Sequence, residues 1–107
     1  MKLYGLKNCD TCRKALKALV AAGYEAELVD VREAPVSVDV LAGWYAAFGA
    51  ALLNTRSTTW RGLSESERAG DPLALLAANP ALMKRPVIEQ ADKRTLGWTA
   101  AAQKEWI

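Results

Sequence analysis

Residues 2–20 read KLYGLKNCDTCRKALKALV, a short strand-like run followed directly by a helix-like run. Lys2 to Leu6 has the length and apolar content of a strand. From Thr11 onward the apolar residues recur at the spacing of an amphipathic helix, and Gly23 is a suitable helix stop. Glu25 to Val31 follows as a second strand. This β-α-β order predicts parallel strands joined by a right-handed crossover.

The remaining segments predict helices first and strands later. Val36 to Phe48 has helical periodicity with Ser37 as its N-cap, and Ser64 with Glu67 forms a capping-box pattern. A polar break is expected at 54–59. The later predicted elements are a helix at 73–78, a strand entered through 83–88, a strand at 94–97 and a helix at 99–106. The order predicts an α/β fold: a thioredoxin-like β-α-β … β-β-α framework, in one domain of residues 1–107, with a helical insertion between the halves at roughly 36–80.

Composition and charge exclude several classes of function. Fourteen Lys and Arg against twelve Asp and Glu give no basic excess of the kind that nucleic-acid binders show. The apolar run from Trp44 to Leu53 is too short to span a membrane, and the N-terminal run is too short for a secretion signal. The chain has no histidine, which removes Ser-His-Asp and Cys-His catalysis. We expect a cytoplasmic monomer without direct nucleic-acid or membrane contact.

The two cysteines, Cys9 and Cys12, lie between the first predicted strand and the first predicted helix. A CxxC pair in this context is typical of thiol redox proteins. Unpaired N–H groups and the dipole at a helix N-terminus stabilise a thiolate. Lys7 and Arg13 add positive charge nearby, and Asp10 is a candidate helix cap. We therefore assign Cys9 as the nucleophile and Cys12 as the resolving thiol.

Two other interpretations of the cysteine pair remain open. In the first interpretation, the two cysteines supply half of the ligands of a zinc site, although four protein ligands are usual and the chain has no further cysteine or histidine. Alternatively, both cysteines are inert, since free cysteine is often simply buried. Cys12, on the inner side of the helix, is the better candidate for a packing residue. We expect no bound metal or cofactor.

The Arg85-Pro86 pair at the entry to the third strand has two interpretations. Proline is permitted at a strand start, and Lys84 and Arg85 are then ordinary surface cations. In the functional interpretation, Pro86 is a cis-proline that faces the cysteines and turns the neighbouring backbone toward a thiol substrate. Arg85 then reaches an oxyanion or a carboxylate.

The polar stretch 54–61 also has two interpretations. It is either a solvated loop or the second arm of an anion pocket. In the second case Arg56 supplies a planar donor fork for an oxyanion or a carboxylate, and Trp60 packs under it. The remaining tryptophans are interpreted as core or helix-face residues: Trp44, Trp98 and Trp106.

Three segments together carry a family resemblance. They are Leu3–Ala15 (LYGLKNCDTCRKA), Leu52–Arg56 (LLNTR) and Lys84–Ile88 (KRPVI), followed by Gly97. In this order, and over nearly the whole chain, they resemble the ArsC/Spx family, and most closely its small ArsC-like branch of glutathione-dependent thiol reductases. The resemblance implies a thioredoxin-like fold with an extra helical segment.

The resemblance also implies how the site works. Cys9 matches the catalytic cysteine, and Arg56 and Arg85 match arginines that surround it and bind the oxyanion. We add Asn8 to the anion-binding residues and Pro86 as their structural neighbour. Glutathione, and in arsenate reductases proper also glutaredoxin, completes the cycle. Those enzymes carry serine at the position of Cys12.

The CxxC itself resembles Spx, which implies an alternative function. Spx is a redox-sensing regulator that binds the RNA polymerase α subunit. The sequence therefore predicts an ArsC-like thiol-disulfide oxidoreductase, with a polymerase-binding thiol switch as the alternative.

Overall fold

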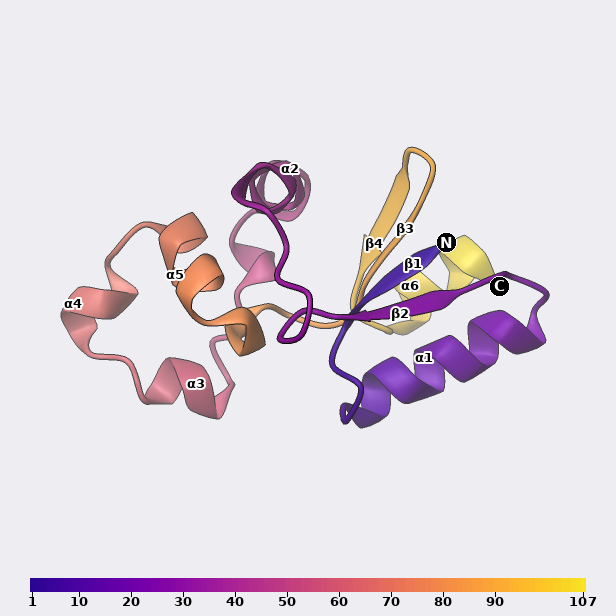
Figure 1. The fold of residues 1–107 in the computed structure, drawn as a ribbon, viewed down its shortest axis with the longest axis horizontal. Helices are drawn as coiled ribbons and strands as arrows, with labels where there is room; N and C mark the ends of the chain where they lie inside the picture. Colours follow the sequence, from indigo (N-terminus) through magenta and orange to yellow (C-terminus); the bar gives the residue numbers. More distant parts are fainter. The chain divides into compact units, whose positions relative to one another are not determined.

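The computed structural model describes residues 1–107, which form two compact units (Figure 1). The first unit comprises Met1–Ala34 and Arg85–Ile107, and the second comprises Pro35–Lys84. The helical segment expected at roughly 36–80 falls within the second unit. None of the chain's helices combines the length and the apolar character that a membrane span requires.

The first unit contains a mixed four-stranded sheet in the order β2-β1-β3-β4. Its strands are β1 (Lys2–Gly5), β2 (Glu27–Asp30), β3 (Val87–Gln90) and β4 (Lys93–Leu96). β1 pairs in parallel with β2 and antiparallel with β3, and β3 and β4 form an antiparallel hairpin. Together with α1 (Asp10–Ala21) and α6 (Ala100–Trp106), this confirms the predicted β-α-β … β-β-α order.

Apolar side chains from β1, β3, α1 and α6 meet in one buried cluster. Its members are Leu3, Cys12, Ala15, Leu19, Ile88 and Trp106. The helix α1 places Cys12, Ala15 and Leu19 on one face. The apolar residues that recur at helical spacing in the sequence are therefore the ones that α1 contributes to this core. Two hydrogen bonds fix α6. The Trp106 indole Nε1–H donates to Thr95 Oγ1 at 2.7 Å, and the Tyr24 hydroxyl donates to the Trp106 carbonyl at 2.5 Å.

The two parallel strands are shorter than the sequence predicted. β1 ends at Gly5 rather than Leu6, and β2 runs from Glu27 to Asp30 rather than from Glu25 to Val31. The register explains the later start of β2. Glu27 pairs with Lys2, the first residue of β1, so residues before Glu27 have no strand partner.

The second unit is helical, as its periodicity predicted. It contains α2 (Val38–Phe48), η1 (Gly49–Leu52), α3 (Thr58–Arg61), α4 (Glu65–Arg68), α5 (Pro72–Ala78) and η2 (Pro80–Leu82). Ser37 caps α2 by accepting from the Val40 N–H, and Ser64 and Glu67 form the predicted capping box at α4. These capping predictions are confirmed.

The polar break expected at 54–59 is only partly a loop. The Asn54 side-chain oxygen accepts from the Arg56 N–H at 3.2 Å, which forms the expected local turn. Ser57, however, starts α3, because its hydroxyl accepts from the Trp60 N–H at 3.1 Å. The same residue types make turns and helix caps, so the pattern alone did not separate the two.

Candidate functional site

Cys9 lies at the N-terminus of α1, where it is the N-cap residue with extended backbone angles (φ −92°, ψ 120°). A short loop, residues 6–8, connects it to β1. The Cys9 N–H donates to the Leu6 carbonyl at 3.1 Å, and the Cys9 carbonyl accepts from the Arg13 N–H at 3.0 Å. The side chain is partly exposed. A thiol at this position faces the unpaired N–H groups of the first helical turn.

The surroundings of Cys9 favour its thiolate. Partial burial raises the pKa of Cys9, but the interactions with the Cys12 backbone N–H, the Cys12 side chain and the Arg85 guanidinium outweigh it. The net effect holds the pKa of Cys9 below its ordinary value. The thiolate is the nucleophilic form of cysteine, so a lowered pKa enlarges the reactive fraction of Cys9 at a given pH.

Cys12 has the opposite environment. Its side chain is fully buried, and this burial raises the pKa of Cys12 from 9.0 to about 11, with the neighbouring Cys9 adding to the rise. Both cysteines are free thiols. Cys9 therefore loses its proton at lower pH than Cys12 does, and Cys12 keeps its own proton at neutral pH.

Gly5 provides the space that Cys12 occupies. A Cβ atom at position 5 would lie 2.3 Å from Cys12 Sγ, far inside van der Waals contact. Glycine inside a strand is typical where another group approaches the backbone closely. This role of Gly5 was not predicted from the sequence, although a glycine in the strand before a CxxC helix was the signal for it.

Arg85 and Pro86 directly precede β3. The Arg85–Pro86 peptide bond is cis, as the functional interpretation assumed. Pro86 is fully buried, and its carbonyl accepts from the Gly97 N–H at 2.8 Å. Arg85 acts electrostatically on both Cys9 and Cys12. The structure thus brings one of the two predicted arginines to the cysteine pair.

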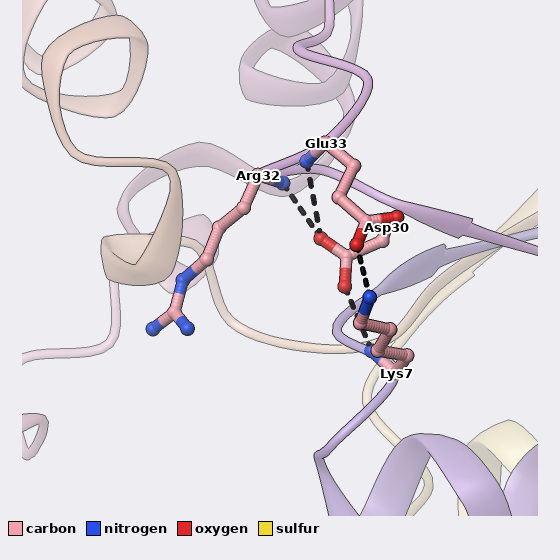
Figure 2. A network of polar contacts seen from close by, with 4 residues as sticks. All are labelled: Lys7, Asp30, Arg32 and Glu33. Carbon is pink, nitrogen blue, oxygen red and sulfur yellow. Dashed lines mark hydrogen bonds and ion pairs between the residues drawn. The ribbon is translucent and has the colours of Figure 1, made fainter.

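Lys7 and Arg13 do not supply the positive charge that the sequence analysis expected at Cys9. The Lys7 ammonium forms an ion pair with Glu33 (Figure 2), and the Arg13 Nε–H donates to the Lys7 carbonyl at 2.9 Å. The cation that lowers the pKa of Cys9 is Arg85. Asp10 is the first helical residue rather than the cap, because Cys9 takes the N-cap position.

The other two predicted anion-binding residues, Asn8 and Arg56, lie in different units of the chain. Asn8 is exposed and directly precedes Cys9. Arg56 is exposed and belongs to the second unit, so its place beside Cys9 stays a prediction. The cation over the Trp60 ring is Arg68, 5.5 Å from the ring centroid, where the sequence analysis expected Arg56. No group of three or more His, Cys, Asp or Glu side chains is placed to hold a metal ion.

Comparison with known proteins places nearly the whole chain in one family. The model of the ArsC family matches residues 4–105. The chain belongs to the ArsC family. An uncharacterized protein of Haemophilus influenzae is 42% identical over 101 residues, covering 90% of this chain and 89% of its own length. The Bacillus subtilis protein YusI is 32% identical over 106 residues, covering 92% of this chain and 90% of its own.

Solved structures agree with the family assignment. The YFFB protein superposes with a TM-score of 0.87 at 30% identity, covering 98% of this chain and 96% of its own. An arsenate reductase (ArsC) related protein from Brucella melitensis gives 0.74 at 30% identity, covering 98% and 92%. The ArsC-type thioredoxin-like fold is therefore established for this chain, with Cys9 and Cys12 at the N-terminus of its first helix.

Proposed function

We propose that this ArsC-family protein is a cytoplasmic thiol-disulfide oxidoreductase in which Cys9 is the nucleophile and glutathione is the co-substrate. The observation that carries the proposal is the opposite environment of the two cysteines: the pKa of Cys9 is lowered and that of Cys12 is raised. Family membership and the arsenate reductase-related neighbour support a reductase-like function.

In the first step the Cys9 thiolate attacks one sulfur of a substrate disulfide. A bond forms between Cys9 and that sulfur, the substrate S–S bond breaks, and the other sulfur leaves as a thiolate that takes a proton from solvent. The partial exposure of Cys9 gives the substrate access to the attacking sulfur.

In the second step Cys12 resolves the mixed disulfide. Cys12 gives up its proton and attacks the Cys9 sulfur, so that a Cys9–Cys12 disulfide forms and the bond between Cys9 and the substrate sulfur breaks. The second substrate sulfur leaves as a thiolate and takes up the proton that Cys12 has lost. Once Cys9 is disulfide-bonded it carries no charge, so its contribution to the raised pKa of Cys12 is lost and only burial remains. Two glutathione molecules then reduce the disulfide and become glutathione disulfide. Glutaredoxin is the protein alternative for this step.

The arginines suit an anionic co-substrate. A guanidinium group pairs with carboxylates and tetrahedral oxyanions through parallel N–H donors, and glutathione carries two carboxylates. Arg85 stands beside the cysteines for this role, and Arg56 and Asn8 are its proposed companions. An oxyanion such as arsenate would use the same groups.

The test is the pH dependence of Cys9 alkylation by iodoacetamide, with and without glutathione or arsenate. We expect a midpoint below the ~8.5 of a free cysteine, together with protection by the ligand that the site accepts. Cys9→Ser should abolish disulfide reduction, and Cys12→Ser should trap a mixed disulfide on Cys9. Full activity of Cys9→Ser would refute the enzyme. Oxidation-dependent capture of the RNA polymerase α subunit would instead favour the Spx-like switch.

A further inference from the structure

The carboxylate of Asp30, the last residue of β2, accepts three backbone hydrogen bonds (Figure 2). The Lys7 N–H donates to Oδ2 at 3.0 Å. The N–H groups of Arg32 and Glu33 donate to Oδ1 at 2.9 Å and 3.3 Å. One oxygen thus holds the turn that follows β2, while the other holds the loop that leads to Cys9.

We propose that Asp30 is a positioning residue for Cys9, because it anchors the loop of residues 6–8 to the end of β2. The inference rests on the proposed role of Cys9 as the nucleophile. Asp30 acts only through the backbone of Lys7, which lies two residues before Cys9.

Both polar groups of Lys7's backbone are held from outside the loop. Its N–H is bound by Asp30, and its carbonyl accepts from Arg13 Nε at 2.9 Å. Within the loop the Cys9 N–H donates to the Leu6 carbonyl at 3.1 Å. A displacement of Lys7 therefore moves the residues that place the Cys9 sulfur over the helix N-terminus.

The turn after β2 holds the Asp30 side chain ready for this contact. The Ala34 N–H donates to the Asp30 carbonyl at 2.8 Å, and the Val31 N–H donates to the Gly5 carbonyl at 2.9 Å. The second bond keeps the end of β2 beside the end of β1. The distance between the Asp30 side chain and the start of the loop at residue 6 is therefore fixed by the strand pairing.

The ionisation of Asp30 agrees with this role. The hydrogen bond from the Lys7 N–H is the main cause that lowers the pKa of Asp30; desolvation opposes it, and the N–H groups of Arg32 and Glu33 and the charge of Lys7 add to the lowering. The nearby acidic group, Glu33, is paired with the Lys7 ammonium. Asp30 is thus a carboxylate at neutral pH, which is the stronger acceptor for a backbone N–H.

Direct electrostatics and positioning predict opposite effects on Cys9. A carboxylate near a thiol disfavours the thiolate, so removing the charge of Asp30 would by itself lower the pKa of Cys9. Loss of the anchor instead loosens the contacts of Cys9 with the Cys12 N–H and Arg85, which raises the pKa of Cys9. The sign of the change therefore separates the two mechanisms.

The experiment compares Asp30→Ala, Asp30→Asn and the control Glu33→Gln in the full chain, with Cys9 alkylation by iodoacetamide followed by mass spectrometry across pH. Glu33→Gln removes an acidic group from the same network but leaves the Lys7 N–H bound. We expect the midpoint to rise in Asp30→Ala and the rate at pH 7 to fall on the order of threefold, since less Cys9 is thiolate. The midpoint is the deciding quantity, because a thiolate of higher pKa is intrinsically more nucleophilic.

Hydrogen exchange at the Lys7 amide gives an independent readout. The exchange should accelerate in Asp30→Ala and stay unchanged in Glu33→Gln.

Asp30→Asn keeps one acceptor oxygen and should raise the alkylation midpoint less. This variant decides between the two mechanisms if Asp30→Ala does not fold. The positioning role is overturned if the midpoint is unchanged or lowered in a folded variant whose Lys7 amide exchange is accelerated, or if that exchange accelerates in no folded variant of Asp30. A native Cys9 that titrates like a free thiol would instead contradict the proposed function, whatever the variants do.

Discussion

Replacing Gly5 with alanine should create a clash that depends on the sulfur of Cys12. The added Cβ would lie 2.3 Å from Cys12 Sγ but 3.4 Å from Cys12 Cβ. The clash is therefore with the thiol alone, and Cys12→Ala removes it. Because Cys12 is fully buried, its sulfur has no solvent-facing space into which it can move.

The expected energies follow from this geometry. Overpacking a filled core costs about 1–3 kcal/mol, and the lower end applies if the thiol turns to a strained rotamer costing roughly 1 kcal/mol. In the Cys12→Ala background the new methyl group fills part of the space left by the sulfur, so Gly5→Ala should cost little there. The coupling energy of the double-mutant cycle should thus be about 1–3 kcal/mol, with the two changes compensating each other.

The assay is urea unfolding of the native protein, both single variants and the double variant under reducing conditions. Gly23→Ala is a contrast, because no atom lies within 4 Å of the Cβ it would add and its cost arises from the positive φ of 99°. Gly23→Ala should therefore add to Cys12→Ala without coupling. Additivity of Gly5→Ala and Cys12→Ala within about 0.5 kcal/mol would refute the packing argument.

Three further predictions concern the thiols and one helix cap. Arg85→Ala should raise the alkylation midpoint of Cys9, and Arg85→Lys, which keeps the charge without the planar fork, should raise it less. Native Cys12 holds its proton to a pKa of about 11 while an unfolded cysteine releases it near 9, so the unfolding free energy should fall between pH 9 and 11. This decrease of the unfolding free energy should be larger in the unsubstituted protein than in Cys12→Ala, and urea unfolding across that pH range will measure it. Ser37→Ala should lower the unfolding free energy by about 1 kcal/mol, because the Val40 N–H loses its cap, and Ser37→Thr should restore most of it.

Structural features that depend on neighbouring residues in the sequence could be predicted. Contacts between residues far apart in the sequence could not. The strand, CxxC and helix order placed Cys9 at a helix N-terminus, and Ser37 and Ser64 were recognised as caps because their partners are three residues away. The four-residue helix α3 was missed, since so short a helix depends on its surroundings more than on its own sequence.

The site residues divide in the same way. Arg85 and Pro86 stood out in the sequence, but the contribution of Gly5 requires the packing of α1 on β1, and that of Asp30 requires the parallel pairing of β1 and β2. Lys7 looked like a positive neighbour of Cys9, and only the fold reveals that Glu33 pairs with it. Pairing between residues 26 positions apart leaves no local pattern to recognise.

The two cysteines of the motif differ because their backbone positions differ. Cys9, at the N-cap, keeps partial exposure and interacts with the Cys12 N–H and Arg85. Cys12, one helical turn further, points into the core, where Gly5 leaves room for its sulfur. The buried Cys12 thiol keeps its proton and stabilises the Cys9 thiolate, which lowers the pKa of Cys9. Cys9 in turn raises the pKa of Cys12, so each cysteine moves the pKa of the other further from its own. Two titratable groups whose environments push their pKa values apart have distinct chemical roles. Gly5 and Arg85, which lie outside the CxxC motif, therefore help to determine which of its sulfurs attacks.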